Sequence, residues 1–464
     1  MYHCGDVVND ITIAYIGGGS RGWAWRLMSD LAAEECMSGT VRLYDIDFEA
    51  AQDNELLGNK LCDREEVKGK WQYKAVETLE AALSGADFIV ISILPGTFAD
   101  MASDVHLPEQ YGIYQSVGDT VGPGGLLRAL RTIPMYVEIA QAIKKYSPQA
   151  WVINYTNPMA LCTKTLYEVF PEIKAFGCCH EVFSTQKLLA AVLREVKGLI
   201  GIDRSEIKIN VLGINHFTWI TEASYKSMDV FSLYKEFVDL FYQEGYEDSA
   251  QKGHWINDSF SSANRVKFDL FKRYGVIAAA GDRHLAEFVP SNWYLKDRHT
   301  IEKWKFNLTT VDWRINDLHT RRGKSKELVN GREKFELKES GEEGVKQIKA
   351  LLGLQDLVTN VNMLNRGQVM GIPMGAVVET NALFRKDSLR PIMAGKLPIA
   401  IESLVVRHVY NQESILRASL TKDKTLALSA FLNDPLITIP VDNATQLFHE
   451  MLYNSRKYLG GWNL

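Results

Sequence analysis

The sequence lacks the features that mark nucleic-acid-binding, membrane or disulfide-stabilised proteins. It has no block of lysines and arginines, and a formal net charge of −5 provides no basic field for nucleic acid. No apolar run reaches the roughly 18 residues of a membrane-spanning helix, and Met1 to Asp10 contain no long apolar segment. The six cysteines are scattered without a framework, which is typical of a reducing compartment. We therefore expect a cytoplasmic protein with no nucleic-acid or membrane partner.

The length and composition of the chain predict a large folded protein. Its 464 residues are 46% hydrophobic and 23% charged, which is enough for two domains with substantial cores. Strand and helix patterns alternate up to about residue 200 and then change in character. We expect an α/β fold, with a Rossmann-type doubly wound parallel sheet in residues 1–200 and a second, α+β domain in residues 201–464.

A glycine-rich turn follows the first predicted strand. Ile11 to Ile16 form a mostly apolar run that leads directly into Gly17-Gly18-Gly19-Ser20-Arg21-Gly22, a complete G-x-G-x-x-G motif. The first glycine permits the turn, the second lets a pyrophosphate approach the backbone, and the third lets the next helix pack closely. Free N–H groups at the start of that helix would then bind phosphate.

An acidic residue at the end of the second strand strengthens this prediction. The run from Thr40 ends in Asp45, 23 positions after Gly22 (45 − 22), where a carboxylate can accept both ribose hydroxyls of adenosine and repel a 2′-phosphate. The pattern therefore favours NAD over NADP. The alternative is an ordinary glycine turn followed by an exposed aspartate.

Further parallel strands should bring other polar residues to the same edge. A buried strand over 87–93 ends at Pro95-Gly96, where the cofactor crevice should open, and Asn157 follows a strand over 150–155. Cys179 and His180 follow a strand over 174–177. Ligands bind at the carboxyl ends of parallel strands in such sheets, so we expect these side chains near the cofactor.

Cys179 and His216 are candidate metal ligands. Strands over 207–212 and 217–221 flank His216 and indicate an antiparallel arrangement. A thiol and an imidazole would hold a metal while leaving most of its coordination sphere open for substrate. The alternative is a small buried cysteine and a hydrogen-bonded core histidine. Helices over 397–418, 424–433 and 443–457 are expected to close the chain.

Several short motifs in one order carry a family resemblance. The chain resembles the NAD- and Mn²⁺-dependent glycoside hydrolases of family 4, whose first domain is similar to that of lactate and malate dehydrogenases. The motifs span roughly residues 10 to 290 and are Ile16-Gly17-Gly18-Gly19-Ser20, Leu43-Tyr44-Asp45-Ile46-Asp47, Gly118-Asp119-Thr120-Val121-Gly122-Pro123-Gly124-Gly125, Thr156-Asn157-Pro158, Gly177-Cys178-Cys179-His180, Gly213-Ile214-Asn215-His216 and Gly281-Asp282-Arg283-His284.

The resemblance implies an elimination and addition route, in contrast to two-carboxylate hydrolysis. NAD⁺ takes hydride from sugar C3, the ketone acidifies the C2 proton, a base removes that proton, and the glycosidic oxygen leaves. Water then adds and NADH reduces C3 again, so the cofactor is not consumed. A homodimer or homotetramer is the family expectation.

The resemblance also assigns roles to residues. It places the metal, Mn²⁺ or another divalent ion, on Cys179 and His216. A metal with open coordination positions there could bind sugar O2 and O3 and act as a Lewis acid. Asn157 would hold a sugar hydroxyl beside the nicotinamide. Asp282 is the aligned candidate for the C2 base, with Tyr274 as a second choice, and His180 occupies the position of the leaving-group acid, where many members have an aspartate or asparagine.

Differences from relatives predict the substrate class. Members that act on 6-phosphorylated sugars carry an arginine after the fourth strand, whereas this chain has Ser92-Ile93-Leu94-Pro95-Gly96 there. Cys179 to Val182, Cys-His-Glu-Val, is similar to the α-galacturonidase branch. We therefore expect an exo-acting α-uronidase for small oligosaccharides, with Arg283, Arg131 or His284 pairing with the uronate carboxylate.

Three alternatives remain open from the sequence. The first is a neutral-sugar α-galactosidase or α-glucosidase of the same family. The second is an NAD-dependent 2-hydroxy-acid dehydrogenase, which needs no metal and so leaves Cys179 and His216 without a role. The third is a non-catalytic NAD-binding sensor, which leaves the motifs of the second domain unused.

Overall fold

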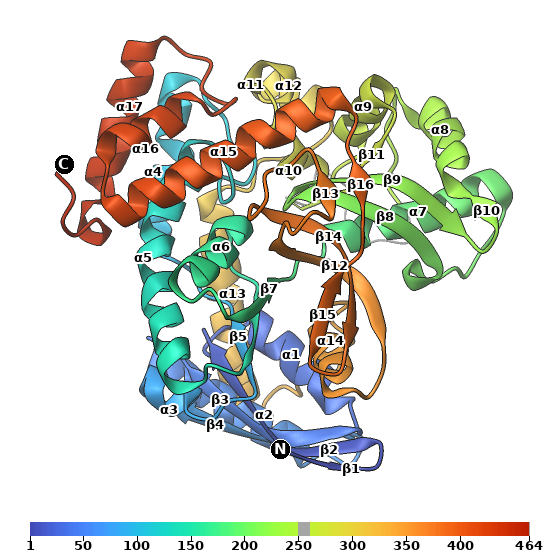
Figure 1. Cartoon of the computed structure of the whole chain (residues 1–464), viewed down its shortest axis with the longest axis vertical. Coiled ribbons are helices and arrows are strands. Elements are labelled where there is room, and N and C mark those ends of the chain that lie inside the picture. The colour runs from blue at the N-terminus through green and yellow to red at the C-terminus, as the bar shows by residue number, and fades with distance from the viewer. Residues whose placement is uncertain (249–259, 464) are drawn as a thin grey trace.

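The structure, a computed structural model, describes residues 1–248 and 260–463 (Figure 1). Its centre is a sheet in which six parallel strands lie in the order β4-β3-β2-β5-β6-β7. This is the order of the Rossmann fold, and the predicted fold class is confirmed. The parallel strands are β2 (Val7–Ile16), β3 (Met37–Tyr44), β4 (Lys70–Val76), β5 (Phe88–Ile91), β6 (Trp151–Asn154) and β7 (Lys174–Gly177).

The strand order reverses between β2 and β5, and this places the cofactor edge. The two strands are hydrogen-bonded neighbours although β3 and β4 come between them in the sequence. A crevice for ligands opens outside the carboxyl ends of strands at such a switch point. Gly17 follows β2 and Pro95 follows β5, so the predicted cofactor segments lie at this edge.

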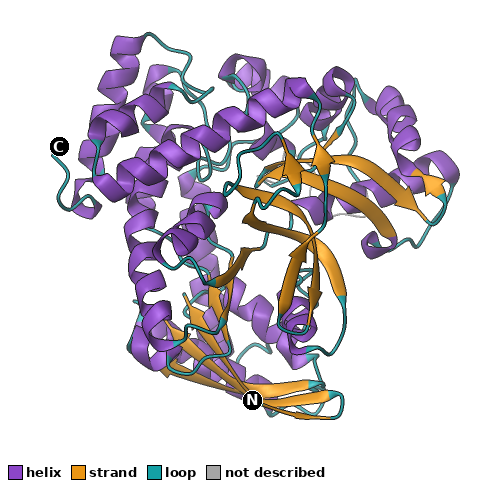
Figure 2. Ribbon diagram, in the orientation of Figure 1, coloured by secondary structure: helices purple, strands orange, loops and turns teal. Residues whose placement is uncertain are grey.

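The central strands are mainly apolar because helices cover both faces of the sheet (Figure 2). Along β2, Ile13 and Tyr15 face one core while Ala14 and Ile16 face the other. One core includes side chains of α1, α2 and α14, and the other includes α3, α5 and α6. Their bounds are α1 (Trp23–Ala32), α2 (Phe48–Cys62), α3 (Leu79–Leu83), α5 (Gly122–Tyr146), α6 (Met159–Val169) and α14 (Gly344–Leu352).

The carboxyl-terminal half of the chain extends the same sheet. Beyond β7 the order continues with β12, β14 and β15, all antiparallel, and Asn362 of β12 pairs with Gly177 of β7. The boundary expected at residue 200 therefore does not separate two independent sheets. The added strands are β12 (Leu357–Leu364), β14 (Val377–Arg385) and β15 (Ser388–Pro391), and the short β1 (Tyr2–Cys4) pairs with β2.

A second, antiparallel sheet holds the predicted hairpin. β8 and β9 pair in register from Ile207↔Tyr225 to Ile214↔Phe217, so the antiparallel prediction is confirmed. The turn between them consists of Asn215 and His216, and His216 has a φ of 64°. The strands are β8 (Ile207–Ile214), β9 (Phe217–Tyr225), β10 (Met228–Asp229) and β11 (Ile277–Ala278), and β13 (Val369–Met370) and β16 (Gly395–Lys396) form a separate pair.

Helices surround this second sheet and complete its core. The three closing helices are confirmed as α15, α16 and α17, whose apolar side chains share one core with β8, β9 and the first half of α5. None of the helices in the described part of the chain is long and apolar enough to cross a membrane. The remaining bounds are α4 (Phe98–His106), α7 (Glu181–Lys197), α8 (Val230–Phe241), α9 (Arg265–Tyr274), α10 (Asp282–Glu287), α11 (Ser291–Tyr294), α12 (Arg298–Lys303), α13 (Val311–Val329), α15 (Ile399–Thr421), α16 (Lys424–Leu432) and α17 (Val441–Asn454).

Candidate active site

The turn after β2 has the tight geometry that the glycine motif predicts. Gly17 has a φ of 94°, and a Cβ there would lie 2.0 Å from the carbonyl oxygen of Ser92. A Cβ on Gly18 would lie 2.8 Å from Cα of Leu43. Any side chain at these two positions would collide with the neighbouring backbone, so only glycine fits the turn. The turn therefore carries no side chain between its backbone and a ligand.

Asp45 supports this loop from the end of β3. Its Oδ2 accepts the N–H of Gly19 at 2.9 Å, and its Oδ1 accepts the N–H of Asp47 at 2.9 Å. Burial raises the pKa of Asp45 above its ordinary value, although these N–H groups act in the opposite direction. The structure thus places Asp45 against the glycine loop, and ribose binding stays a prediction.

The other predicted cofactor residues also lie around the start of α1. Ser20 Oγ accepts the N–H of Trp23 at 3.1 Å, Arg21 lies 3.7 Å from Asp53, and Gly22 directly precedes the helix. The first turn of α1 contains no acidic residue that would repel phosphate. Pro95 is buried beyond the end of β5.

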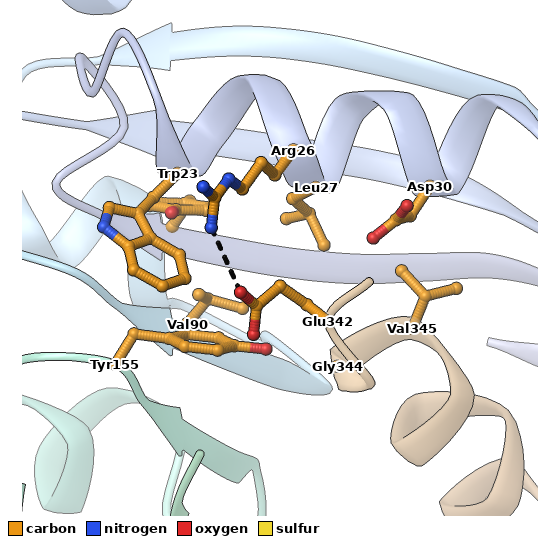
Figure 3. Close-up of a pocket in the computed structure, with 10 residues that line it drawn as sticks. Trp23, Arg26, Leu27, Asp30, Val90, Tyr155, Glu342, Gly344 and Val345 are labelled. Atoms are coloured by element: carbon orange, nitrogen blue, oxygen red, sulfur yellow. Dashed lines mark hydrogen bonds and ion pairs between the residues drawn. The ribbon is translucent and has the colours of Figure 1, made fainter. Parts of the chain in front are cut away.

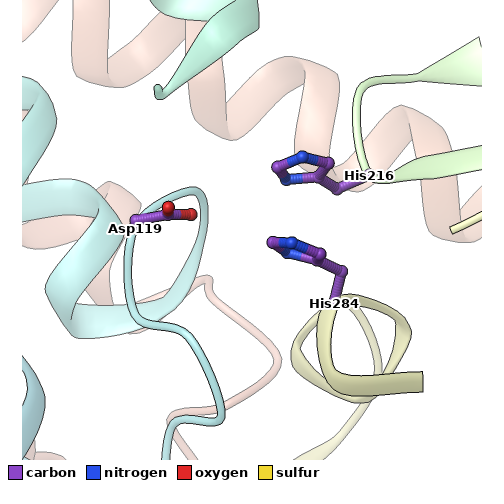
Figure 4. Close-up of side chains that lie close together, drawn as sticks. All are labelled: Asp119, His216 and His284. Atoms are coloured by element: carbon purple, nitrogen blue, oxygen red, sulfur yellow. The ribbon is translucent and has the colours of Figure 1, made fainter. Parts of the chain in front are cut away.

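Three side chains from distant segments meet in one cluster (Figure 4). Asp119 from the loop before α5, His216 from the β8–β9 turn and His284 from α10 place their ligand atoms within 4.8 Å of one another. The two imidazole rings are stacked with centroids 3.7 Å apart. Sequence reasoning assigned His216 to the metal and His284 to substrate, and it gave Asp119 no role although the Gly118-Asp119-Thr120 motif was recognised.

Hydrogen bonds fix the orientation of His216. Thr120 donates its hydroxyl proton to Asp119 Oδ1 at 2.7 Å, and the same Oγ1 lies 2.9 Å from His216 Nδ1. Because that proton is already used, Nδ1–H donates to Thr120 and Nε2 keeps its lone pair. Partners of this kind fix the tautomer of metal-ligating histidines.

The electrostatics of the cluster suit a cation. Burial would raise the pKa of Asp119, but the positive charge of Arg128, with a smaller contribution from Arg314, lowers it well below its usual value. Burial lowers the pKa of His216, and it lowers the pKa of His284 to about 3. The cluster therefore presents one carboxylate and two neutral imidazoles, and the buried Nδ1 of His284 has no hydrogen-bond partner.

The segment before Asp119 is held by α10. Glu287 Oε1 accepts the N–H groups of Val117 and Gly118 at 2.7 and 2.9 Å. Ser116 donates its hydroxyl to the carbonyl of Arg283 at 2.5 Å. One short helix thus carries His284 and also the groups that position Asp119. Sequence reasoning missed Glu287, because its role depends on contacts with residues about 170 positions away.

Cys179 lies outside this group of three ligand atoms. Its side chain is buried, and its pKa lies well above the ordinary value, first because of burial and then because of the nearby Glu379 and Glu181. The buried side chain of Asn215, beside His216 in sequence, lies against Cys179 and Glu379. The predicted pairing of Cys179 with His216 on a metal stays a prediction.

His180 directly precedes α7 and contacts Glu342, which lines a small pocket next to α1 (Figure 3). Its Nδ1 is 3.3 Å from Glu342, and its ring lies 6.1 Å from that of Trp23. Glu342, which lines the pocket, also pairs with Arg26 at 3.1 Å. Burial would lower the pKa of His180, but Glu342 and Glu181 raise it above its ordinary value. A histidine that holds its proton near neutral pH can serve as an acid.

The two candidate bases lie at opposite ends of α9. Asp282 accepts the N–H groups of Val266 and Lys267 at its start, at 3.3 and 3.0 Å, and burial raises the pKa of Asp282 to about 6. Tyr274 ends the helix and packs edge-on against Trp219. A helix of ten residues is about 15 Å long, and the two side chains lie toward its opposite ends.

Asn157 reaches the cluster, whereas Arg131 does not. Asn157 Nδ2 donates to Asp119 Oδ2 at 3.4 Å, and its buried Oδ1 has no partner. Arg131 is 1% exposed and forms a two-bond ion pair with Asp104, with a further bond to Ser455. The expectation that Arg131 binds a substrate carboxylate is therefore wrong, because its guanidinium is occupied within the core. Arg283 instead adjoins the cluster on α10.

Comparisons with known proteins place most of the chain in one family. A model described as "Family 4 glycosyl hydrolase" matches residues 12–195, and a model of the carboxyl-terminal domain of the same family matches residues 211–437. The chain is 67% identical to an α-galacturonidase of Thermoanaerobacterium saccharolyticum over 98% of both chains.

Solved structures show the same fold. A putative glucosidase from Bacillus subtilis superposes with a TM-score of 0.92 at 55% identity, covering 96% of this chain and 100% of that one. A 6-phospho-α-glucosidase from gut microorganisms, solved in complex with NAD and Mn²⁺, superposes with a TM-score of 0.80 at 20% identity, covering 98% and 100%.

Proposed function

Because the chain belongs to family 4 of the glycosyl hydrolases, we propose that it hydrolyses small α-linked galacturonides with NAD and a divalent metal ion as cofactors. The observation that carries the substrate class is the 67% identity, over nearly the whole length, to an α-galacturonidase. The absence of a cation in the segment after β5, which ends at Leu94-Pro95-Gly96, agrees with a substrate that has no 6-phosphate.

The edge at the β2–β5 switch point fits NAD. The glycine turn leaves no side chain over the backbone, and the start of α1 offers N–H groups without a competing acidic residue. Asp45 stands at the end of β3, where a carboxylate selects the 2′-hydroxyl of NAD. A relative of the same fold was solved with NAD and Mn²⁺, which supports this pair of cofactors.

The cluster fits a divalent metal ion. Neutral imidazoles and an ionised carboxylate are ligands that Mn²⁺ accepts, and the unpartnered His284 Nδ1 lacks any other use among the described residues. We propose His216 as a ligand, with Cys179 as predicted and with Asp119 and His284 as additional candidates. A bound ion at this place supplies Lewis-acid stabilisation of negative charge on sugar oxygens, and NAD supplies a reversible oxidation at C3.

The chain's own residues supply proton transfer and orientation. His180 keeps a proton beside Glu342 and is our candidate for the acid that protonates the leaving oxygen. Asp282, with a pKa near 6, has the basicity needed to take a proton from C2, and we keep it as the preferred base over Tyr274. Asn157, with one free amide oxygen next to Asp119, would orient a sugar hydroxyl.

Following NADH at 340 nm together with sugar release tests this function. Digalacturonate, NAD⁺ and Mn²⁺ should yield galacturonate with no net NADH, because the cofactor returns to its oxidised form in each turnover. Net NADH without sugar release would instead indicate the 2-hydroxy-acid dehydrogenase. Faster hydrolysis of α-galactosides or α-glucosides than of galacturonides would assign the chain to the neutral-sugar branch.

We also propose a cytoplasmic homodimer or homotetramer. The five cysteines whose side chains the structure describes are free, which agrees with a reducing compartment. Large apolar side chains are exposed near the β13–β16 pair, namely Met370, Met374, Met393 and Ile399. A contiguous exposed apolar patch is a mark of an association surface, and these four side chains are our candidates for one.

A further inference from the structure

Arg283 is a buried cation with no acidic partner in contact. It is 7% exposed, and its Nη1 donates to the Thr309 hydroxyl while its guanidinium carbon lies 4.7 Å from the Phe260 ring centroid. No carboxylate of the described residues lies within 4.0 Å of it, in contrast to Arg131, which has a two-bond partner in Asp104. An unpaired buried charge is costly unless a ligand completes it.

The remaining donors of Arg283 are available. Its Nε and Nη2 donate to no atom of the described residues, and neither is among the fully buried polar atoms without a partner. A guanidinium presents these two donors as a planar fork that matches the two oxygens of a carboxylate. The Thr309 hydroxyl and the Phe260 ring hold the group from other sides, so its orientation is set before a ligand arrives.

Three arginines lie around the cluster. Arg128, Arg283 and Arg314 interact electrostatically with Asp119, and Glu181 is a second acid near Arg283. Positive charge of this kind favours an anionic group on the substrate over a neutral one.

We infer that Arg283 binds the carboxylate of the uronate and thereby determines the specificity for an acidic over a neutral sugar. This inference rests on the proposed function and names the residue that carries its substrate class. Arg283 interacts electrostatically with Asp119, His216 and His284, so a carboxylate held by its fork lies near the cluster that would bind the sugar's other oxygens. The ion pair between Arg283 and the carboxylate would then distinguish a uronate from its ester.

Two substrates that differ in that charge and by one methyl group test the inference. They are α-linked digalacturonides whose non-reducing residue is either the free acid or the methyl ester. The unaltered protein should favour the acid by at least about 100-fold in kcat/KM. Arg283→Gln should reduce this preference to within about 10-fold, mainly through loss on the acid, and Arg283→Lys should keep an intermediate preference because it retains charge but loses the fork.

Controls separate recognition from folding. Arg417→Gln makes the same chemical change at an exposed position of α15 and should leave the ratio unchanged. Melting temperature and NAD⁺ affinity of each variant report on folding. If Arg283→Gln lowers both activities equally, so that the ratio stays at the unaltered value, the inference is overturned while the proposed function stands. If the unaltered protein cleaves neither substrate, the proposed function itself fails.

Discussion

His216 shows how far single residues could be identified from the sequence. Its position between two predicted strands indicated a ligand in a turn, and the structure places it there, in the cluster. Asp119 was missed because an aspartate between glycine and threonine is also ordinary turn sequence. Arg131 was assigned wrongly because the sequence does not show that Asp104, 27 positions away, occupies its guanidinium.

The metal ligands can be distinguished by substitution. His216→Ala should weaken Mn²⁺ binding by more than about 100-fold, because it removes a ligand and because even the loss of outer partners costs 10–100-fold. Cys179→Ser and His284→Gln then decide which further group binds the ion. NAD⁺ affinity should stay nearly unchanged in all three variants. Calorimetric titration with Mn²⁺ measures the effect, and full Mn²⁺ affinity in His216→Ala would refute the site.

Glu287 should act through position and not through charge. Glu287→Gln keeps an oxygen that can accept the N–H groups of Val117 and Gly118, so Mn²⁺ affinity and kcat should change by less than about threefold. Glu287→Ala removes that acceptor, and Asp119 loses its support. We expect about 10–100-fold weaker Mn²⁺ binding for the alanine variant, as for other outer partners. Equal losses in both variants would show that accepting these two N–H groups is not what Glu287 contributes.

Strands and helices with strong apolar patterns could be predicted from the sequence, and those with weak patterns could not. The buried strands β2, β5, β6 and β7 and the three closing helices follow from runs of apolar residues. Strand β4 was missed, because Lys70 to Val76 alternates with charged residues at the sheet edge, although Trp71 and Tyr73 carried a period of two.

The contact between α15 and α10 predicts a pH dependence of stability. His408 of α15 is 1% exposed, and its Nε2 donates to the Phe288 carbonyl at 2.8 Å. Burial lowers the pKa of His408 to about 4 from an ordinary value of 6.5. As pH falls, His408 therefore becomes protonated in the unfolded chain at a higher pH than in the folded protein. The stability that depends on the neutral ring is complete above pH 6.5 and is lost as pH falls toward 4.

The size of this effect follows from the shift. Each pKa unit corresponds to about 1.4 kcal/mol, so the unaltered protein should lose roughly 3 kcal/mol more than His408→Gln between pH 7 and pH 4. Urea unfolding at several pH values measures the difference. His319→Gln, at an exposed position of α13, is the matched control and should follow the unaltered protein. Parallel pH profiles for His408→Gln and the unaltered protein would contradict the assignment.

At the scale of the whole molecule, the two halves of the chain are joined by one sheet. β12, β14 and β15 extend the Rossmann sheet, and α14 completes one of its cores. Sequence patterns showed the change of character near residue 200, but they could not show that later strands return to the first sheet. That pairing rests on a long-range register between Gly177 and Asn362, which no local pattern encodes.

The exposed apolar side chains near β13 and β16 predict the assembly surface. Met393 is 67% exposed and Ile399 is 80% exposed. Met393→Glu with Ile399→Glu should shift the protein to monomers in light scattering, because a charge would be buried at the contact. Ile200→Glu, at an isolated position of 81% exposure, is the control and should leave the assembly intact. An assembly unaffected by the double substitution would place the interface elsewhere.

Hydrogen exchange at C2 of the sugar distinguishes the elimination route from direct displacement at C1. Turnover of digalacturonate in D₂O, with NAD⁺ and Mn²⁺, should give galacturonate that carries deuterium at C2, because a base in exchange with solvent removes that proton before water adds. Asp282→Asn should suppress both exchange and hydrolysis if Asp282 is that base. Galacturonate released without deuterium at C2 would contradict the elimination route, because direct displacement at C1 leaves the C2 proton in place.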